Sequence, residues 1–204
     1  MISGLYSVSA ISRQRIGLFG GSFNPAHQGH VAVSEEALKR LQLDRVWWLV
    51  SPGNPIKSHD NLADLSARIE QAKQISEHKH IEITGFEASL PTNYTAQTLK
   101  FLKRRYKGVH FVWLMGADNL ATFHTWQHWQ DIFHTMPIAV FDRPGYHLKA
   151  MASPAAHKFK QYQVNQFAAK RLATKPAPAW SYLTHKLSPL SSTQLRHSEK
   201  NLKS

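Results

Sequence analysis

The 204-residue sequence contains no cysteine. Disulfides, cysteine-ligated zinc, iron–sulfur clusters and thiol catalysis are therefore excluded, and nothing indicates secretion, so we expect a cytoplasmic protein. No stretch approaches 18 consecutive apolar residues, which excludes a transmembrane helix, and we expect no membrane partner. Acidic residues are also scarce, because 13 Asp and Glu oppose 25 Lys and Arg. The formal charge of +12 attracts polyanions, a class that includes nucleic acids, nucleotides and pyrophosphate.

The basic residues are scattered rather than concentrated in one block. The densest groups lie at 100–107 and 158–175, in segments with helical periodicity, where such charge is typical of a solvated face. A nucleic-acid-binding protein would need a basic stripe with stacking aromatic rings, whereas the aromatic residues here lie mostly in strand-like apolar runs. We therefore expect no nucleic-acid partner. This class stays a rival hypothesis, which salt-dependent binding to random DNA would test.

Short apolar runs alternate along the chain with segments of helical periodicity. The alternation indicates parallel βαβ units, hence an α/β fold with a doubly wound, mostly parallel sheet. Neither Pro/Gly-rich stretch separates two halves that could each hold a core, so we expect one domain over residues 15–204 after a flexible arm at 1–14. The expected strands are 15–19, 46–50, 80–84, 110–115, 137–141 and 180–183, and the expected helices are 31–41, 65–75, 95–106, 126–133 and 155–172.

The first strand–helix junction, residues 20–30 (GGSFNPAHQGH), carries the most chemistry. Gly20 and Gly21 permit a tight turn and close backbone approach to a ligand, and the following helix N-terminus suits a phosphate. His27 and His30 are three apart, so they face the same side of the first turn, where imidazoles can donate hydrogen bonds to phosphoryl oxygens.

Other interpretations of this junction have less support. Zinc is the alternative ligand for a histidine pair, but no third or fourth ligand stands at metal-ligand spacing, so we expect no protein metal site. The junction matches neither the Gly-x-Gly-x-x-Gly pattern of dinucleotide-binding folds nor a Walker A sequence. Dehydrogenase and P-loop hypotheses therefore lose their main support.

The junction as a whole resembles the signature of the nucleotidyltransferase superfamily with the HxGH motif. The matching positions are Gly21, Phe23, Pro25, His27, Gly29 and His30. Near the other end of the chain, residues 190–196 (LSSTQLR) resemble the second signature of that superfamily, Ile-Ser-Ser-Thr-x-Ile-Arg. Taken alone, the Ser-Ser-Thr turn is typical of a helix cap. The two signatures together imply a Rossmann-like nucleotidyltransferase fold.

Four segments between the signatures resemble the nicotinate-nucleotide adenylyltransferase family. Residues 51–57 (SPGNPIK) resemble its loop with a basic residue near the phosphates, and 115–120 (MGADNL) its Gly-x-Asp turn near adenosine. Residues 93–99 (NYTAQTL) resemble the segment whose backbone amides hold the nicotinate carboxylate. Residues 123–129 (FHTWQHW) resemble the aromatic stretch in which a Trp stacks on the pyridine ring. Gln97 stands where the family usually has Asp, so we assign it no role.

The resemblance implies an enzyme that transfers AMP from ATP to nicotinate mononucleotide and releases deamido-NAD and pyrophosphate. It implies that Mg²⁺ arrives with ATP, held mainly by phosphate and water. The implied catalytic residues are His27, His30, Lys57 and Arg196. The implied ATP-binding residues are Gly20, Gly21, Ser22, Phe23, His27, His30, Gly116, Asp118, Ser192, Thr193 and Arg196, and the implied substrate-binding residues are Asn54, Lys57, Tyr94, Thr95 and Trp126.

Several alternatives stay open at this point. Trp126 and Trp129 have the i, i+3 spacing of residues that pack on one helix face. Asp118 stands where a helix cap is expected. Lys57 is of a residue type that is ordinarily found on the surface without a specific role. The rival activity is an adenylyltransferase for nicotinamide mononucleotide or phosphopantetheine. The chain ends soon after Arg196, without the longer terminal helix of many relatives, which leaves a homo-oligomer open.

Overall fold

The computed structural model describes residues 7, 11–53, 62–92 and 94–184. Their six strands form one sheet in the order β3-β2-β1-β4-β5-β6, and every neighbouring pair is parallel. The strands are β1 (Arg15–Gly21), β2 (Arg45–Val50), β3 (Ile81–Thr84), β4 (His110–Gly116), β5 (Ile138–Phe141) and β6 (Trp180–Leu183). Since the order reverses between β1 and β4, the sheet is doubly wound, as the alternation of elements predicted.

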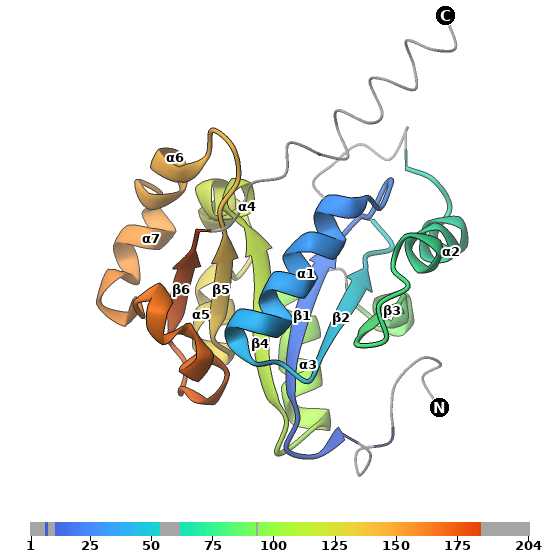
Figure 1. Cartoon of the computed structure of the whole chain (residues 1–204), viewed down its shortest axis with the longest axis horizontal. Coiled ribbons are helices and arrows are strands. Elements are labelled where there is room, and N and C mark those ends of the chain that lie inside the picture. Colours follow the sequence, from blue (N-terminus) through green and yellow to red (C-terminus); the bar gives the residue numbers. More distant parts are fainter. Residues whose placement is uncertain (1–6, 8–10, 54–61, 93, 185–204) are drawn as a thin grey trace, which may run out of the picture.

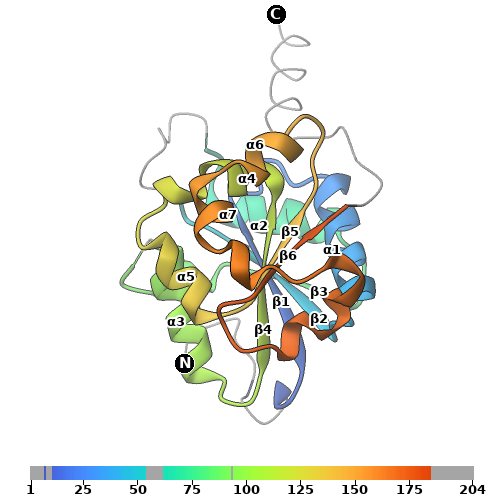
Figure 2. The ribbon, with the colours of Figure 1, turned by 90° about the vertical axis from the view of Figure 1, so that its left-hand side faces the viewer.

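Helices cover both faces of this sheet (Figures 1 and 2). One face carries α1, α2 and the long 3-10 helix η5, and the other carries α3, α4, α5 and α7. The α-helices are α1 (Gln28–Leu41), α2 (Leu65–Ile75), α3 (Thr95–Arg105), α4 (Ala117–Thr122), α5 (Trp129–Thr135), α6 (His147–Met151) and α7 (Pro154–Lys158). The 3-10 helices are η2 (Phe86–Ser89), η3 (Phe123–Thr125), η4 (Lys160–Tyr162) and η5 (Gln166–Thr174).

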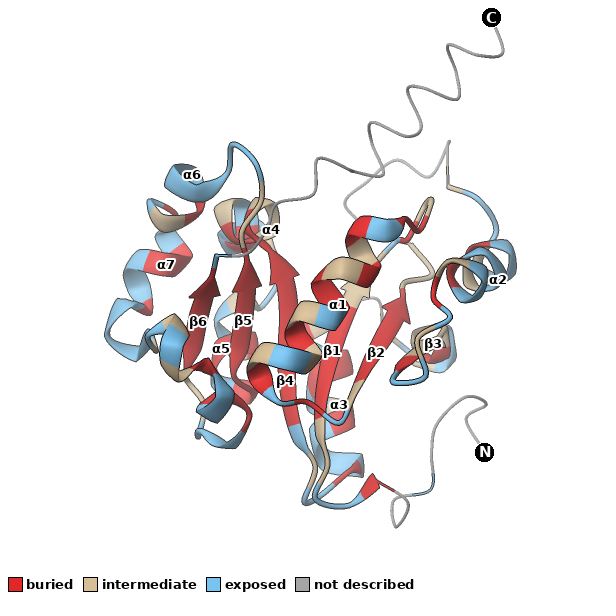
Figure 3. Cartoon of the chain, viewed as in Figure 1, coloured by how far each residue is buried: buried red, intermediate tan, exposed pale blue. Residues whose placement is uncertain are grey.

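The central strands are apolar on both faces, and Figure 3 shows them buried between the helix layers. Side chains alternate across the sheet, so Leu18 packs in the cluster beneath α3 and α5, while its neighbour Phe19 packs in the cluster beneath α1. Full burial of one such side chain stabilises the fold by about 1.5–3 kcal/mol. These strands therefore form a rigid platform whose carboxyl ends lie at one edge.

Two expected helices differ from the structure. In place of one helix at 155–172, the chain forms α7, η4 and η5, because Val164 donates a backbone hydrogen bond to Trp180 O (2.7 Å) and this stretch runs beside β6. Asn165 then caps η5 by accepting from Phe167 N (3.0 Å). The helix expected from Trp126 begins instead at Trp129, since Trp126 has an extended backbone (φ −75°, ψ 139°).

Part of the expected N-terminal arm packs against the domain. Ile11 is 1% exposed and belongs to the hydrophobic core, and Arg13 N donates to Gly108 O (3.1 Å). The division of the chain at residue 14 stays a prediction. Within the described ranges, no helix combines the length and apolarity needed to cross a membrane.

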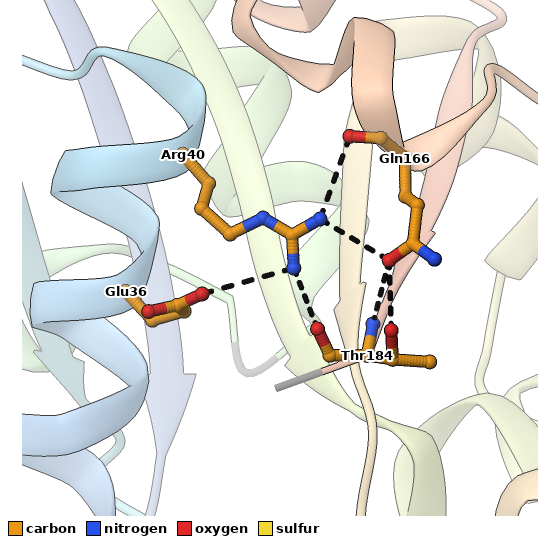
Figure 4. Close-up of polar contacts among 4 residues, drawn as sticks. All are labelled: Glu36, Arg40, Gln166 and Thr184. Atoms are coloured by element: carbon orange, nitrogen blue, oxygen red, sulfur yellow. Dashed lines mark hydrogen bonds and ion pairs between the residues drawn. The ribbon is translucent and has the colours of Figure 1, made fainter. Parts of the chain in front are cut away.

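A polar network ties the end of β6 to α1 (Figure 4). Arg40 donates to Thr184 O (2.6 Å) and to Gln166 Oε1 (3.1 Å), and it lies 3.7 Å from the Glu36 carboxylate. Gln166 Oε1 also accepts from the backbone and hydroxyl of Thr184, at 3.1 and 2.9 Å. The network thus anchors the chain where β6 leaves the sheet, on the helix that begins with the histidine pair.

Candidate active site

The candidate site lies at the carboxyl ends of β1 and β4, where the strand order reverses. Gly20, next to last in β1, and Gly116, the last residue of β4, leave no room for a side chain unless their neighbours move. A Cβ on Gly20 would lie 2.3 Å from the Trp113 ring, and one on Gly116 would lie 2.3 Å from Asp118 Oδ1 and 2.9 Å from Arg143 Nε. A Cβ on Gly21 would lie 3.4 Å from the Phe23 ring, an ordinary contact. The close approach of a ligand expected at Gly20 and Gly21 stays a prediction.

The turn after β1 is anchored by an aromatic ring. Phe23 has a left-handed backbone (φ +45°). The residue is 2% exposed, and its ring stacks on Trp48 with centroids 4.8 Å apart. Because the whole residue is buried, the predicted contact between Phe23 and ATP stays a prediction. Ser22, just before it, is exposed.

The two histidines cap the first turn of α1 reciprocally. His27 is the N-cap, and its Nδ1 accepts from Gly29 N (3.1 Å), while His30 Nδ1 accepts from His27 N (3.2 Å). Their ring centroids are 3.8 Å apart, so the structure brings the predicted pair together. His27 is 4% exposed, whereas His30 is half-buried over the rings of Phe19 and Phe23.

Both imidazoles are neutral at pH 7. Burial, assisted by the positive charge of Arg143, lowers the pKa of His27 to about 4. Burial also holds the pKa of His30 well below its ordinary value, and His27 and Arg143 add to this effect. Since each Nδ1 accepts a backbone hydrogen bond, each neutral ring carries its proton on Nε2. The pair therefore provides two N–H donors of the kind that bind phosphoryl oxygens.

Arg143 was missed in the sequence. It follows β5, and its charge acts on both histidines. Its Nε lies 3.3 Å from Asp118 Oδ1. This contact is an ion pair only, because Asp118 Oδ1 accepts no hydrogen bond from the residues that the structure describes. Its position two residues after an expected strand is the signal that could have identified it, since strand ends carry the ligand sites of such sheets.

Asp118 is thereby linked to the histidines through Arg143. It lies in the first turn of α4, after Gly116, and makes no side-chain cap hydrogen bond there. The helix-cap alternative for this aspartate is therefore not supported. The guanidinium that pairs with Asp118 also acts through its charge on both histidines. Positive charge near two N–H donors suits an anionic nucleotide.

The segment expected to hold the acceptor carboxylate begins α3. Tyr94 is its N-cap residue and makes no side-chain cap hydrogen bond, and Thr95 is the first helical residue and half-buried. Nearby, Glu87 of η2 hydrogen-bonds to Thr98, and burial raises the pKa of this carboxyl to about 7. Glu87 is a second residue missed in the sequence, where no local pattern indicates its burial.

Trp126 and Trp129 both contact the core. Trp126 is half-buried against Phe123, with ring centroids 5.1 Å apart, and Trp129 lies in the cluster of Phe133 and Phe159. Core packing, the alternative to ligand contact, thus accounts for the position of Trp129. It accounts for the buried side of Trp126, which is only half-buried. A contact of Trp126 with a pyridine ring stays a prediction.

Comparison with known proteins places this geometry in a family. The cytidylyltransferase-like family model matches residues 18–198. A protein of Methylorubrum extorquens, named "Probable nicotinate-nucleotide adenylyltransferase", is 53% identical over 89% of this chain and 98% of its own length. The chain belongs to the nicotinate-nucleotide adenylyltransferase family. The family, and with it the enzyme class, was correctly predicted from the sequence.

Other members of the nicotinate-nucleotide adenylyltransferase family agree in sequence and fold. A Bradyrhizobium relative with the same name is 52% identical over 93% of this chain and 99% of its own length. The solved nicotinic acid mononucleotide adenylyltransferase of Plasmodium falciparum, complexed with NaAD, matches with a TM-score of 0.69 over 90% of this chain and 83% of its own. At 18% identity that match concerns the fold, and it confirms the Rossmann-like nucleotidyltransferase fold.

Some residues expected to act in this adenylyltransferase fall outside the described ranges. They are Asn54, Lys57, Ser192, Thr193 and Arg196. Their roles stay predictions, as do the ligand contacts of the residues that are described. The described part of the site therefore consists of the turn after β1, the histidine pair, the Asp118–Arg143 ion pair and the start of α3.

Proposed function

We propose that this chain transfers AMP from ATP to nicotinate mononucleotide and releases deamido-NAD and pyrophosphate. The observation that carries the proposal is the pair of neutral imidazoles, 3.8 Å apart at the start of α1 and beside Arg143. Such a pair, at the switch point of a doubly wound sheet, is suited to a polyphosphate. The names of the relatives that are about 50% identical support the same reaction.

In this reaction a phosphate oxygen of the mononucleotide attacks the α-phosphorus of ATP. A new P–O bond forms, the bond from the α-phosphorus to the oxygen bridging to the β-phosphate breaks, and pyrophosphate leaves with that oxygen. The nucleophile is already anionic, so no general base is needed. Catalysis then consists of positioning the two substrates and stabilising charge around phosphorus.

The chain's own residues divide this work in the proposal. His27 and His30 donate Nε2–H hydrogen bonds to phosphate oxygens, and Arg143 adds positive charge beside them. Lys57 and Arg196 also contact the phosphates. The backbone and side chains of Gly20, Gly21, Ser22, Phe23, Gly116, Asp118, Ser192 and Thr193 bind the rest of ATP, and Asn54, Tyr94, Thr95 and Trp126 bind the acceptor.

Magnesium belongs to the proposal as an ion that accompanies ATP. Within the described residues, no group of three or more His, Asp or Glu side chains is placed to hold a metal. Asp118, the carboxylate among the described ATP-binding candidates, is paired with Arg143. Phosphate oxygens and water supply the ligands that Mg²⁺ prefers, so the substrate itself carries it into the site.

The first test removes one imidazole. His30→Ala should lower kcat at least about a hundredfold in a steady-state pyrophosphate-release assay, because a donor to the developing charge is lost. The control is His124→Ala, an exposed histidine of η3, which should keep wild-type activity. Mass detection of deamido-NAD identifies the product. An unchanged kcat in a folded His30→Ala protein contradicts the role of the pair.

The second test concerns the acceptor. With ATP and Mg²⁺ present, nicotinate mononucleotide should be used with a higher kcat/KM than nicotinamide mononucleotide or phosphopantetheine when the acceptors compete. The expected reason is that backbone amides at the start of α3 hold a carboxylate, which a site built for it discriminates strongly from a neutral amide. Equal values for the two mononucleotides would agree with adenylyl transfer and contradict the preference for the acid.

A cytoplasmic location and a homo-oligomer stay predictions.

A further inference from the structure

A buried arginine lies beneath the candidate site, outside the two signatures. Arg68, in the first turns of α2, is 2% exposed. Its guanidinium donates to four backbone carbonyls: Ala63 O at 2.8 Å, Ser22 O at 2.7 Å, Ser51 O at 2.8 Å and Pro52 O at 3.4 Å. Burial of a charged group costs free energy unless polar partners compensate it. Among the described residues no carboxylate lies within ion-pair distance of Arg68, and the dipoles of backbone carbonyls compensate its charge instead.

These carbonyls belong to two different loops of the site. Ser22 lies in the turn between β1 and the histidine pair, and Ser51 and Pro52 follow β2 and lead toward residues 54–57, where the acceptor contacts Asn54 and Lys57 are predicted. One Arg68 nitrogen, Nη1, bonds to both loops at once. Backbone bonding continues between them, because Ser51 N donates to Gly21 O (2.9 Å).

The hydrogen bond from Arg68 to Ser22 O is the one that acts directly on the turn before the histidine pair. The next residue, Phe23, has the left-handed backbone that non-glycine residues rarely adopt. Such conformations persist where surrounding contacts over-determine them. Arg68 fixes the peptide on one side of Phe23, and the stacked Trp48 ring fixes its side chain. Together they set the direction in which the chain enters the cap formed by His27 and His30.

We infer that Arg68 is a positioning residue that fixes the turn after β1, at Ser22, and the start of the loop after β2, at Ser51 and Pro52, relative to each other. This inference rests on the proposed adenylyl transfer and adds to it a residue that need not touch either substrate. Lysine cannot replace it fully, because an ammonium offers three donors from one nitrogen, whereas the planar guanidinium reaches acceptors on several sides. Arg68 thereby lets the binding of one substrate assist the binding of the other.

The test compares Arg68→Lys and Arg68→Met with the wild type in two-substrate kinetics. Arg68→Lys should lower kcat about tenfold and Arg68→Met about a hundredfold, since a misplacement near 1 Å costs on that order. The KM values for ATP and for nicotinate mononucleotide should both rise at least about threefold. The matched control is Arg45→Lys, which removes an arginine that pairs with Glu82 at the opposite edge of the sheet, and it should stay within about twofold of the wild type.

Binding gives a readout that a loss of stability alone would not change. Calorimetry with α,β-methylene-ATP, with and without nicotinate mononucleotide, should show several-fold tighter binding in the presence of the acceptor for the wild type. Arg68→Lys should lose this difference at a temperature where circular dichroism shows it folded. Should Arg68→Met fail to fold, Arg68→Lys decides the matter.

The outcomes separate the two hypotheses. A wild type that forms no dinucleotide overturns the proposed function. An active wild type with an Arg68→Lys protein of unchanged kcat and KM values overturns the positioning role. So does a change in the KM of one substrate only, or a lowered melting temperature with normal kinetics, or a wild type without any binding synergy.

Discussion

His27 should make the stability of this protein depend on pH. The ring is 4% exposed, and burial together with Arg143 lowers its pKa to about 4, against 6.5 for a free histidine. Its substitution by asparagine removes the titration and keeps the cap, because an asparagine side chain also accepts from Gly29 N and is among the preferred N-cap residues. The backbone bond from residue 27 to His30 Nδ1 is unaffected.

The sign and size follow from linkage. As pH falls through 6.5, His27 of the unfolded chain takes up a proton that the folded protein resists until about pH 4. Stability is thus fully present above pH 6.5 and is lost progressively below it. At a pH of about 4.5 the difference amounts to about 2–3 kcal/mol, since each pKa unit corresponds to about 1.4 kcal/mol. His30, 3.8 Å away, adds a loss in the same direction in both proteins.

The assay is urea unfolding followed by circular dichroism at pH values of about 7.5 and about 4.5. Between these pH values His27→Asn should lose about 2–3 kcal/mol less than the wild type. Carboxylates contribute equally to both proteins. His27→Asn also removes the charge of His27 that helps to lower the pKa of His30, so the loss due to His30 becomes smaller too and the difference between the two proteins reports the histidine pair. The exposed His124→Asn should keep the wild-type loss. Equal losses in His27→Asn and the wild type, within about 0.5 kcal/mol, would refute the assignment of a buried, neutral His27.

Two further predictions concern neighbouring features. Gly116→Ala should raise the KM for ATP at least about tenfold with an unchanged circular dichroism spectrum, because its Cβ would displace Asp118 and Arg143; an unchanged KM would mean that the ion pair is not part of the ATP site. Gln166→Ala should lower the unfolding free energy by about 1 kcal/mol in urea titrations, since Arg40 and Thr184 lose their shared acceptor. Gln161→Ala, at an exposed position, serves as its control. Equal stability of the two variants would contradict a stabilising role of the polar network between β6 and α1.

Much of the fold could be predicted locally. Buried parallel strands are continuous apolar runs that end at turn residues, so RIGLF before Gly20 and VWWLV before Ser51 identify β1 and β2 from their own composition. The helix at 65–75 follows from periodicity in the same way, and its bounds agree with α2. The expected helix over 155–172 failed because Val164 pairs with Trp180, a contact that no periodicity within the helix encodes.

In the candidate site, too, the features that depend on local sequence were predicted and those that depend on tertiary contacts were not. The histidine pair is encoded locally, since an N-cap residue and the residue three positions later lie at the same end of one helix and can cap each other. The signature around the pair identified the family. Arg143, Glu87 and Arg68 were not identified, because their importance lies in what surrounds them: Asp118 and the histidines, the buried Thr98, and the carbonyls of two separate loops.

The amino-acid order alone therefore determined the strand–helix alternation, the glycine turn and the two imidazoles of this adenylyltransferase-family chain. Tertiary structure decided the charge state of those imidazoles and the residues that hold them. The physical reason is that apolar periodicity and residue spacing are local properties of the chain. Desolvation and Coulombic fields, in contrast, depend on every segment that packs around a group.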